Sequence, residues 1–160
     1  MTIFKDYEYY GEKAENYFLL GYNCAQSLIL TFADDFGLDP KLAERLAFPF
    51  GAGMGRLREV CGALSASFML LGLRSAPKSD LECETYDDEK AAAYAEIQAF
   101  AKKFEHEFGS IYCRDLLGLE GKSDPKPEKR TLDYYNNRPC NGIIKVTAYM
   151  LAKYLAEKEN

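Results

Sequence analysis

Residues 48–68 read FPFGAGMGRLREVCGALSASF, a glycine-rich turn with two arginines that leads into a cysteine and an apolar run. From about Glu59 to about Arg74, small and apolar residues recur with helical spacing. Cys61 falls in the first turn of this predicted helix. The apolar content predicts that this helix is the most buried one and lies at the centre of the fold.

The rest of the chain predicts further helices on both sides of this central one. Apolar residues at steps of three and four predict longer helices over about 4–20, 24–36, 87–108 and 139–158. Asp39 with Pro40 predicts the start of a short helix that runs to Ala47, and Ser110 predicts a cap for a second short helix over 111–117. No segment alternates apolar and polar residues, so we predict an all-α fold: a helical bundle of about six or seven helices in a single domain over residues 1–160.

The buried face of the helix over 87–108 is predicted from the same spacing. Its members are Tyr94, Ile97, Ala101, Phe104 and Phe108. His106, the single histidine, falls away from this face, and we expect it to be solvent-exposed. A cysteine–histidine nucleophilic pair is therefore not expected.

Composition and charge restrict the class of protein. With 160 residues, 48% hydrophobic and 28% charged, the chain has ordinary globular composition and enough length for its own core. The net charge of −5 comes without a basic cluster, which argues against nucleic-acid binding. No apolar run is long enough to span a bilayer and no leader is recognisable, so we expect a cytoplasmic protein without membrane insertion. The sequence leaves the redox partner and the oligomeric state open.

Four of the five cysteines share one placement. Each lies near the start of a predicted helix, with an apolar residue three or four positions later: Cys24, Cys61, Cys113 and Cys140. This spacing places each sulfur at the head of the inward face of its helix. Cys83 lies in a predicted surface loop and lacks the pattern. An odd cysteine count in a cytoplasmic chain argues against a framework of structural disulfides.

The shared placement suggests thiol chemistry. A helix N-terminus carries partial positive charge that favours the thiolate, which is both the nucleophile and the metal-binding form of cysteine, whereas burial disfavours it. A lone free cysteine is usually a small core residue, but four similar placements favour one shared site. We therefore expect a thiol-dependent oxidoreductase that cycles between thiols and disulfides or holds a redox centre. Cys61 is the predicted attacking thiol, because the glycine turn gives access and Arg56 and Arg58 precede it.

Two alternatives stay open. The same four cysteines are candidate ligands for zinc or an iron–sulfur cluster, although the chain has no C-x-x-C pair and no nearby histidine to support this. The glycine-rich turn is a candidate site for an anion or another small ligand, with Gly53, Gly55, Arg56 and Arg58 as binding residues. It lacks the preceding strand and the glycine–lysine pair of nucleotide-binding loops, and close packing of helices around a bend is the favoured explanation of its glycines.

The cysteines and their neighbours resemble the C_GCAxxG_C_C family. The resemblance rests on GYNCAQ around Cys24, CGALSA from Cys61, YCRDLLG around Cys113 and RPCNG around Cys140, and it spans nearly the whole chain. In the CGAxxG motif, Ala66 stands where the family has its last glycine. The resemblance implies a small redox-active protein whose four cysteines form the site, and it implies neither a substrate nor a bound cofactor.

Overall fold

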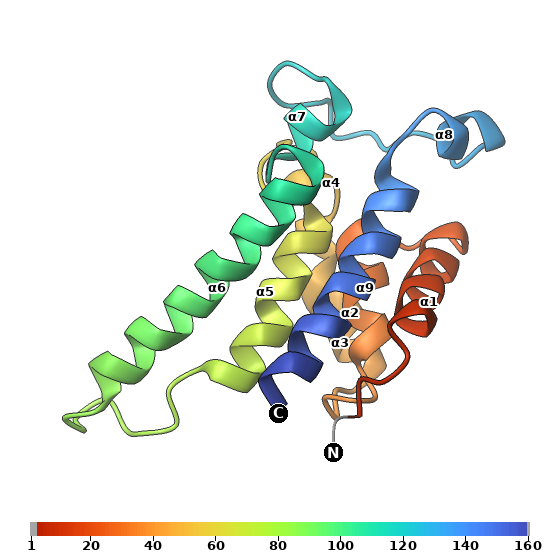
Figure 1. Cartoon of the computed structure of the whole chain (residues 1–160). Helices are drawn as coiled ribbons and strands as arrows, with labels where there is room; N and C mark the ends of the chain where they lie inside the picture. Colours follow the sequence, from red (N-terminus) through yellow and green to blue (C-terminus); the bar gives the residue numbers. More distant parts are fainter. Residues whose placement is uncertain (1–2, 160) are drawn as a thin grey trace.

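The protein folds as a bundle of helices (Figure 1). This computed structural model describes residues 3–159, and within that range no strand is present, apart from one isolated antiparallel bridge between Val60 and Tyr112. The elements in chain order are α1 (Tyr7–Leu19), α2 (Cys24–Phe32), α3 (Pro40–Ala47), the 3₁₀ turn η1 (Phe48–Phe50), α4 (Gly51–Met54), α5 (Gly62–Ser75), α6 (Tyr86–Phe108), α7 (Cys113–Leu117), α8 (Leu132–Asn136) and α9 (Cys140–Glu159). The predicted all-α bundle is confirmed.

The helix after the glycine-rich turn lies inside the bundle, but the prediction that it is the most buried helix is wrong, because eight of the nine residues of α2 are buried against eight of fourteen in α5. Helix α5 packs against α2, α6 and α9, and α1 packs against α2 and α9. Residues 62–67 of α5 are buried, and its Leu64 and Leu71 lie fully inside the core with Ile144 and Leu151 of α9. Burial of each such side chain stabilises the fold by about 1.5–3 kcal/mol.

The first turns of two helices follow directly from local sequence. The Asn23 side chain accepts a hydrogen bond from the Gln26 N–H, and the Gln26 side chain accepts one from the Asn23 N–H, which forms a capping box at the start of α2. The Asp39 side chain accepts from the Leu42 N–H over 2.8 Å, and Pro40 is the first residue of α3. These caps fix where Cys24 and α3 begin.

Several boundaries and one face differ from prediction. Tyr94 is 59% exposed, because α6 packs mainly on α5 and only a narrow stripe with Ala93, Phe100 and Phe104 is covered. Ser110 does not cap a helix at 111; its hydroxyl accepts from the Tyr112 N–H, and α7 begins two residues later than predicted.

Two other boundaries shift and one helix was not predicted. Helix α2 ends at Phe32, four residues before the predicted end, and α5 begins at Gly62 rather than near Glu59. Helix α8 was not predicted at all; Thr131 caps it by accepting from the Tyr134 N–H.

The short helices gather at one end of the bundle. Figure 1 shows α4, α7 and α8 at the top, together with the first turns of α5 and α9, whereas the segment that leads into α1 and the last turn of α9 lie at the bottom. None of the described helices combines the length and apolar character needed to cross a bilayer. Cys24, Cys61, Cys113 and Cys140 lie at the end of the bundle that carries α4, α7 and α8, whereas Cys83 lies in the loop between α5 and α6.

Candidate functional site

The four cysteines singled out by their spacing occupy equivalent helix positions. Cys24, Cys113 and Cys140 are the first residues of α2, α7 and α9, and Cys61 immediately precedes α5. Cys61 and Cys113 are 8% exposed, while Cys24 and Cys140 are half-buried, and all are free thiols. Each therefore sits beside the unpaired N–H groups of a helix start.

All four cysteines line one cavity of about 60 Å³. The remaining lining residues are Phe18, Asn23, Ala52, Arg58, Gly62, Leu116, Leu117, Arg130, Tyr134, Arg138, Ile143 and Ile144. A cavity of this volume has room for about two to four waters, or for a ligand group of a few heavy atoms. The cavity brings together thiols that are up to 116 residues apart in the sequence.

Cys24 has the richest environment of backbone donors. The Ala52 N–H donates to its sulfur over 3.4 Å, and the N–H groups of Ala25 and Gly62 also favour its thiolate. Burial nevertheless raises the pKa of Cys24, and the nearby Cys113 adds to this rise. At neutral pH Cys24 is a protonated thiol whose thiolate has donors already in place.

The loop before α5 reaches Cys24 through an unusual backbone. Residues 52–56 form a run in which every φ is positive, between 55° at Ala52 and 70° at Arg56, and Arg58 follows with a φ of 62°. For residues other than glycine this conformation costs about 1–2 kcal/mol each. Such strain persists where the surrounding structure imposes it, often at functional sites. Here it aims the Ala52 N–H at the sulfur of Cys24.

Glycines allow the elements around the cavity to approach closely. A Cβ added to Gly62 would lie 2.4 Å from the Cys24 sulfur and 2.7 Å from the Phe50 carbonyl oxygen. A Cβ added to Gly53 would lie 2.6 Å from the Cys113 Cβ. Gly62, which follows Cys61 in the CGAxxG motif, is therefore required by the proximity of Cys24 to the start of α5.

The isolated bridge joins the segments that carry Cys61 and Cys113. The Cys61 N–H donates to the Ile111 carbonyl over 2.8 Å, and the Cys113 N–H donates to the Glu59 carbonyl over 2.7 Å. Burial raises the pKa of Cys61 well above its ordinary value, and the neighbouring Cys24 and Cys140 add to the rise. Cys61 is thus held firmly, with its thiol in the protonated form.

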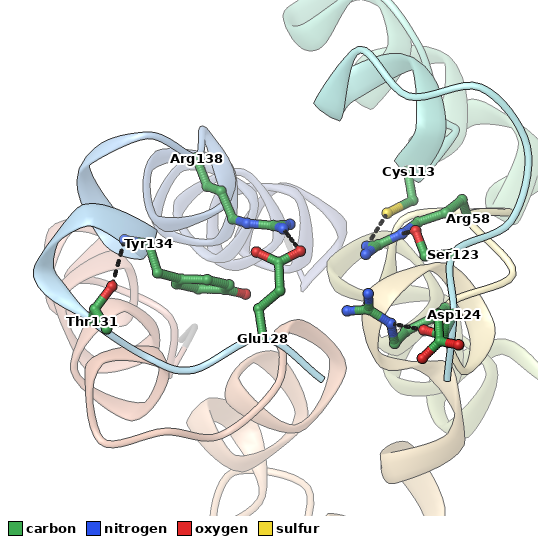
Figure 2. A network of polar contacts seen from close by, with 9 residues as sticks. Arg58, Cys113, Ser123, Asp124, Glu128, Thr131, Tyr134 and Arg138 are labelled. Carbon is green, nitrogen blue, oxygen red and sulfur yellow. Dashed lines mark hydrogen bonds and ion pairs between the residues drawn. The ribbon is translucent and has the colours of Figure 1, made fainter. Parts of the chain in front are cut away.

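The two arginines of the glycine-rich turn serve other partners than Cys61. Arg58 is 2% exposed; its Nε donates to the Ser123 hydroxyl over 2.9 Å and its Nη1 to the Cys113 sulfur over 3.5 Å (Figure 2). Arg56 donates to the Asp124 carbonyl. The guanidinium support predicted for Cys61 therefore goes to Cys113, and among Gly53, Gly55, Arg56 and Arg58 only Arg58 lines the cavity.

Cys140 lies beside an ion pair. Burial raises the pKa of Cys140 to about 12, to which Cys24 and Cys113 contribute, while Arg138 opposes the shift. Arg138 donates to Glu128 and thereby lowers the pKa of that carboxyl (Figure 2). The charge of Arg138 is thus shared between Glu128 and the cavity.

Arg130 and Tyr134 line the cavity but were not predicted from sequence. The Arg130 Cζ lies 4.6 Å from the Phe18 ring centroid and 4.8 Å from that of Tyr134, and its Nη2 donates to the Tyr22 carbonyl over 3.3 Å. Arg130 ends the charged run EGKSDPKPEKR, and nothing local distinguishes it from the exposed Lys129 beside it. Contacts with Phe18 of α1 and Tyr134 of α8 place Arg130 at the cavity.

The remaining candidates are separate from this cavity. Cys83 lies exposed in the loop between α5 and α6, and hydrogen bonds with Thr85 lower its pKa. His106 is exposed, as predicted. Across residues 3–159, no three His, Cys, Asp or Glu side chains are arranged to hold a metal ion. The four cavity cysteines therefore do not form a ready ligand set for zinc or an iron–sulfur cluster.

Comparison with known proteins identifies the family. The family model described as "Putative redox-active protein (C_GCAxxG_C_C)" matches residues 22–154, which include all four cavity cysteines. Neither the comparison with curated proteins nor that with solved structures gave a match. On the extent of the family match, this chain belongs to the C_GCAxxG_C_C family.

Proposed function

We propose that this protein is a thiol-dependent redox protein that cycles two of its cavity cysteines between dithiol and disulfide. The observation that carries the proposal is the single cavity lined by Cys24, Cys61, Cys113 and Cys140. Two thiols that share a cavity can be oxidised together without exposing either to the bulk solvent. The membership of a family described as redox-active supports the same conclusion.

Cys24 is the best-placed attacking thiol. Its sulfur accepts a backbone hydrogen bond from Ala52 and has further support from Gly62, so a thiolate forming there meets donors already in position. It lines the same cavity as Cys61, Cys113 and Cys140. Cys61, expected from sequence to attack, takes the resolving role in this scheme because its neighbour Gly62 touches the Cys24 sulfur.

The reaction balances with a small disulfide as oxidant. The Cys24 thiolate attacks one substrate sulfur, the substrate S–S bond breaks, and the leaving thiolate takes up a proton as the first thiol product. The Cys61 thiolate then attacks the Cys24 sulfur of the mixed disulfide and releases the second thiol product. Two electrons pass from the cysteine pair to the substrate, and a Cys24–Cys61 disulfide remains.

The test is a thiol count on the reduced protein before and after mild oxidation with diamide, in a Cys83→Ser background. We expect two thiols to be lost and peptide mapping to find Cys24 in the new disulfide. Cys24→Ser in the same background abolishes that disulfide, whereas Cys83→Ser alone leaves it unchanged. Four thiols that stay free under oxidant, or anaerobically purified protein with stoichiometric metal on these thiols, would refute the proposal.

A further inference from the structure

The thiol cavity has an excess of positive charge. Three arginines line it, Arg58, Arg130 and Arg138, and no Asp or Glu is among its lining residues. The whole chain carries a net charge of −5, so this local excess opposes the overall balance. Each guanidinium contributes one positive charge and a planar set of N–H donors.

Two of the three charges have no carboxylate partner among the described residues. Arg130 donates through Nη2 to the Tyr22 carbonyl, while its Nη1 is buried without a hydrogen-bond partner. Arg58 donates to the Ser123 hydroxyl and the Cys113 thiol, which are both neutral groups at rest. A buried charge with no opposite charge and an unused donor is costly, and a bound anion would remove that cost.

Two of the three arginines pack against one aromatic ring. Arg130 and Arg138 both lie against the ring of Tyr134, with Cζ atoms 4.8 and 4.6 Å from its centroid. Figure 2 shows the Glu128 carboxylate paired with Arg138 on the side that faces Arg58. Three arginines thus line the cavity beside one carboxylate, and the remaining positive charge favours a further anion.

We propose that the cavity binds a small oxyanion, or the oxyanionic group of a small substrate, through Arg130 and Arg138 with Arg58 on the opposite wall. The cavity of about 60 Å³ accommodates a group of a few heavy atoms beside the four thiols. The inference rests on the proposed redox function in one respect only: it assigns the substrate of that reaction to the class of anions. The binding itself requires the arginines and not the thiols.

The experiment titrates the reduced full-length protein with sodium sulfate, by calorimetry and by thermal unfolding, against sodium chloride at equal ionic strength. A parallel titration uses sodium acetate. Sulfate and acetate both present charged oxygens, so the comparison distinguishes a site for a tetrahedral oxyanion from a site for a carboxylate. We expect sulfate, acetate or both to bind saturably and to raise the Tm. Chloride should neither bind saturably nor raise the Tm. The proposal is overturned if sulfate and acetate both fail to bind saturably and to raise the Tm above its value in chloride.

Variants locate the site. Arg130→Gln should weaken binding at least about tenfold, as expected for a lost charge-assisted hydrogen bond. Arg45→Gln, on the exposed face of α3, removes the same charge and should bind as the parent does. If Arg130→Gln folds poorly, Arg138→Gln gives the same test. Unchanged binding in a folded Arg130→Gln or Arg138→Gln variant contradicts the assignment.

Loss of the thiols separates the two proposals. A variant with serine at Cys24, Cys61, Cys113 and Cys140 should retain sulfate binding although it cannot form a disulfide. If the parent protein binds sulfate but forms no disulfide with the oxidant, only the redox proposal is refuted. Disulfide formation without anion binding refutes the anion site alone.

Discussion

The backbone N–H of Ala52 donates to the sulfur of Cys24 over 3.4 Å, across 28 residues of sequence. Ala52 can do so because its φ is 55°, at the start of the left-handed run over residues 52–56. The turn thus contributes a donor to a thiol. The Gly55 N–H closes the turn by donating to the Gly51 carbonyl, and the Glu59 N–H donates to the Gly53 carbonyl.

Gly62→Ala should destabilise the protein and displace Cys24. The new Cβ would lie 2.4 Å from the Cys24 sulfur and 2.7 Å from a backbone oxygen, and overpacking of this kind costs about 1–3 kcal/mol. The matched control is Gly72→Ala in the same helix, where no atom of another element lies within 4 Å. That change should stabilise by about 0.5–1 kcal/mol, because alanine favours the helix. Urea unfolding of both variants measures the difference, and equal effects would contradict the packing argument.

Stability should fall as the pH rises above about 8.5, in part through Cys140. Its pKa is about 12 in the folded protein, so between these values the unfolded chain loses a proton that the folded protein keeps. Below the pKa of the unfolded chain, the contribution of Cys140 to the free energy of unfolding is fully present. It declines by up to about 1.4 kcal/mol per pH unit as the pH rises toward the pKa in the folded protein. Cys24 and Cys61 shift in the same direction.

Urea unfolding at pH 8, 9 and 10 tests this titration. Over this range the free energy of unfolding of the parent should fall more steeply than that of Cys140→Ser. Cys83→Ser should retain the decline of the parent, because the pKa of Cys83 is lowered rather than raised. A parent and a Cys140→Ser variant that decline in parallel would show that Cys140 ionises normally.

Alkylation should distinguish Cys83 from the cavity thiols. Thr85 lowers the pKa of the exposed Cys83 through its hydroxyl and backbone hydrogen bonds, whereas burial raises the pKa of Cys24, Cys61 and Cys140. Because the thiolate is the reacting form, iodoacetamide at pH 7.5 should label Cys83 first. Peptide mapping over time measures the order. Equal or faster labelling of Cys61 would mean that its thiol is neither buried nor protonated.

Arg58→Met should loosen the segment over residues 119–130. Arg58 holds this segment through the Ser123 hydroxyl, and the Ser123 N–H in turn donates to the Arg56 carbonyl over 2.9 Å. Loss of a charged hydrogen bond of about 1.5–3 kcal/mol predicts local hydrogen exchange that is about ten- to a hundredfold faster. Arg45→Met on the exposed face of α3 is the control. Unchanged exchange in the Arg58 variant would show that other contacts hold the segment.

Local chemistry made much of this fold predictable from sequence. The cap at Asn23 and the Asp39–Pro40 start depend on residues a few positions apart, and both helices begin where these signals place them. The apolar run after Cys61 likewise marked the buried central helix. The prediction of a buried face that includes Tyr94 was wrong, because the number of helices that cover α6 is not a local property of its sequence.

The sequence by itself determined that four cysteines stand at helix starts, since caps and helical periodicity are short-range effects. Only the tertiary structure decided that these starts lie around one cavity, because that depends on how α2, α5, α7 and α9 pack. It also decided which partners meet there. Arg58 reaches Cys113 rather than Cys61, and Arg130 enters from a charged loop, since long-range packing selects which side chains become buried.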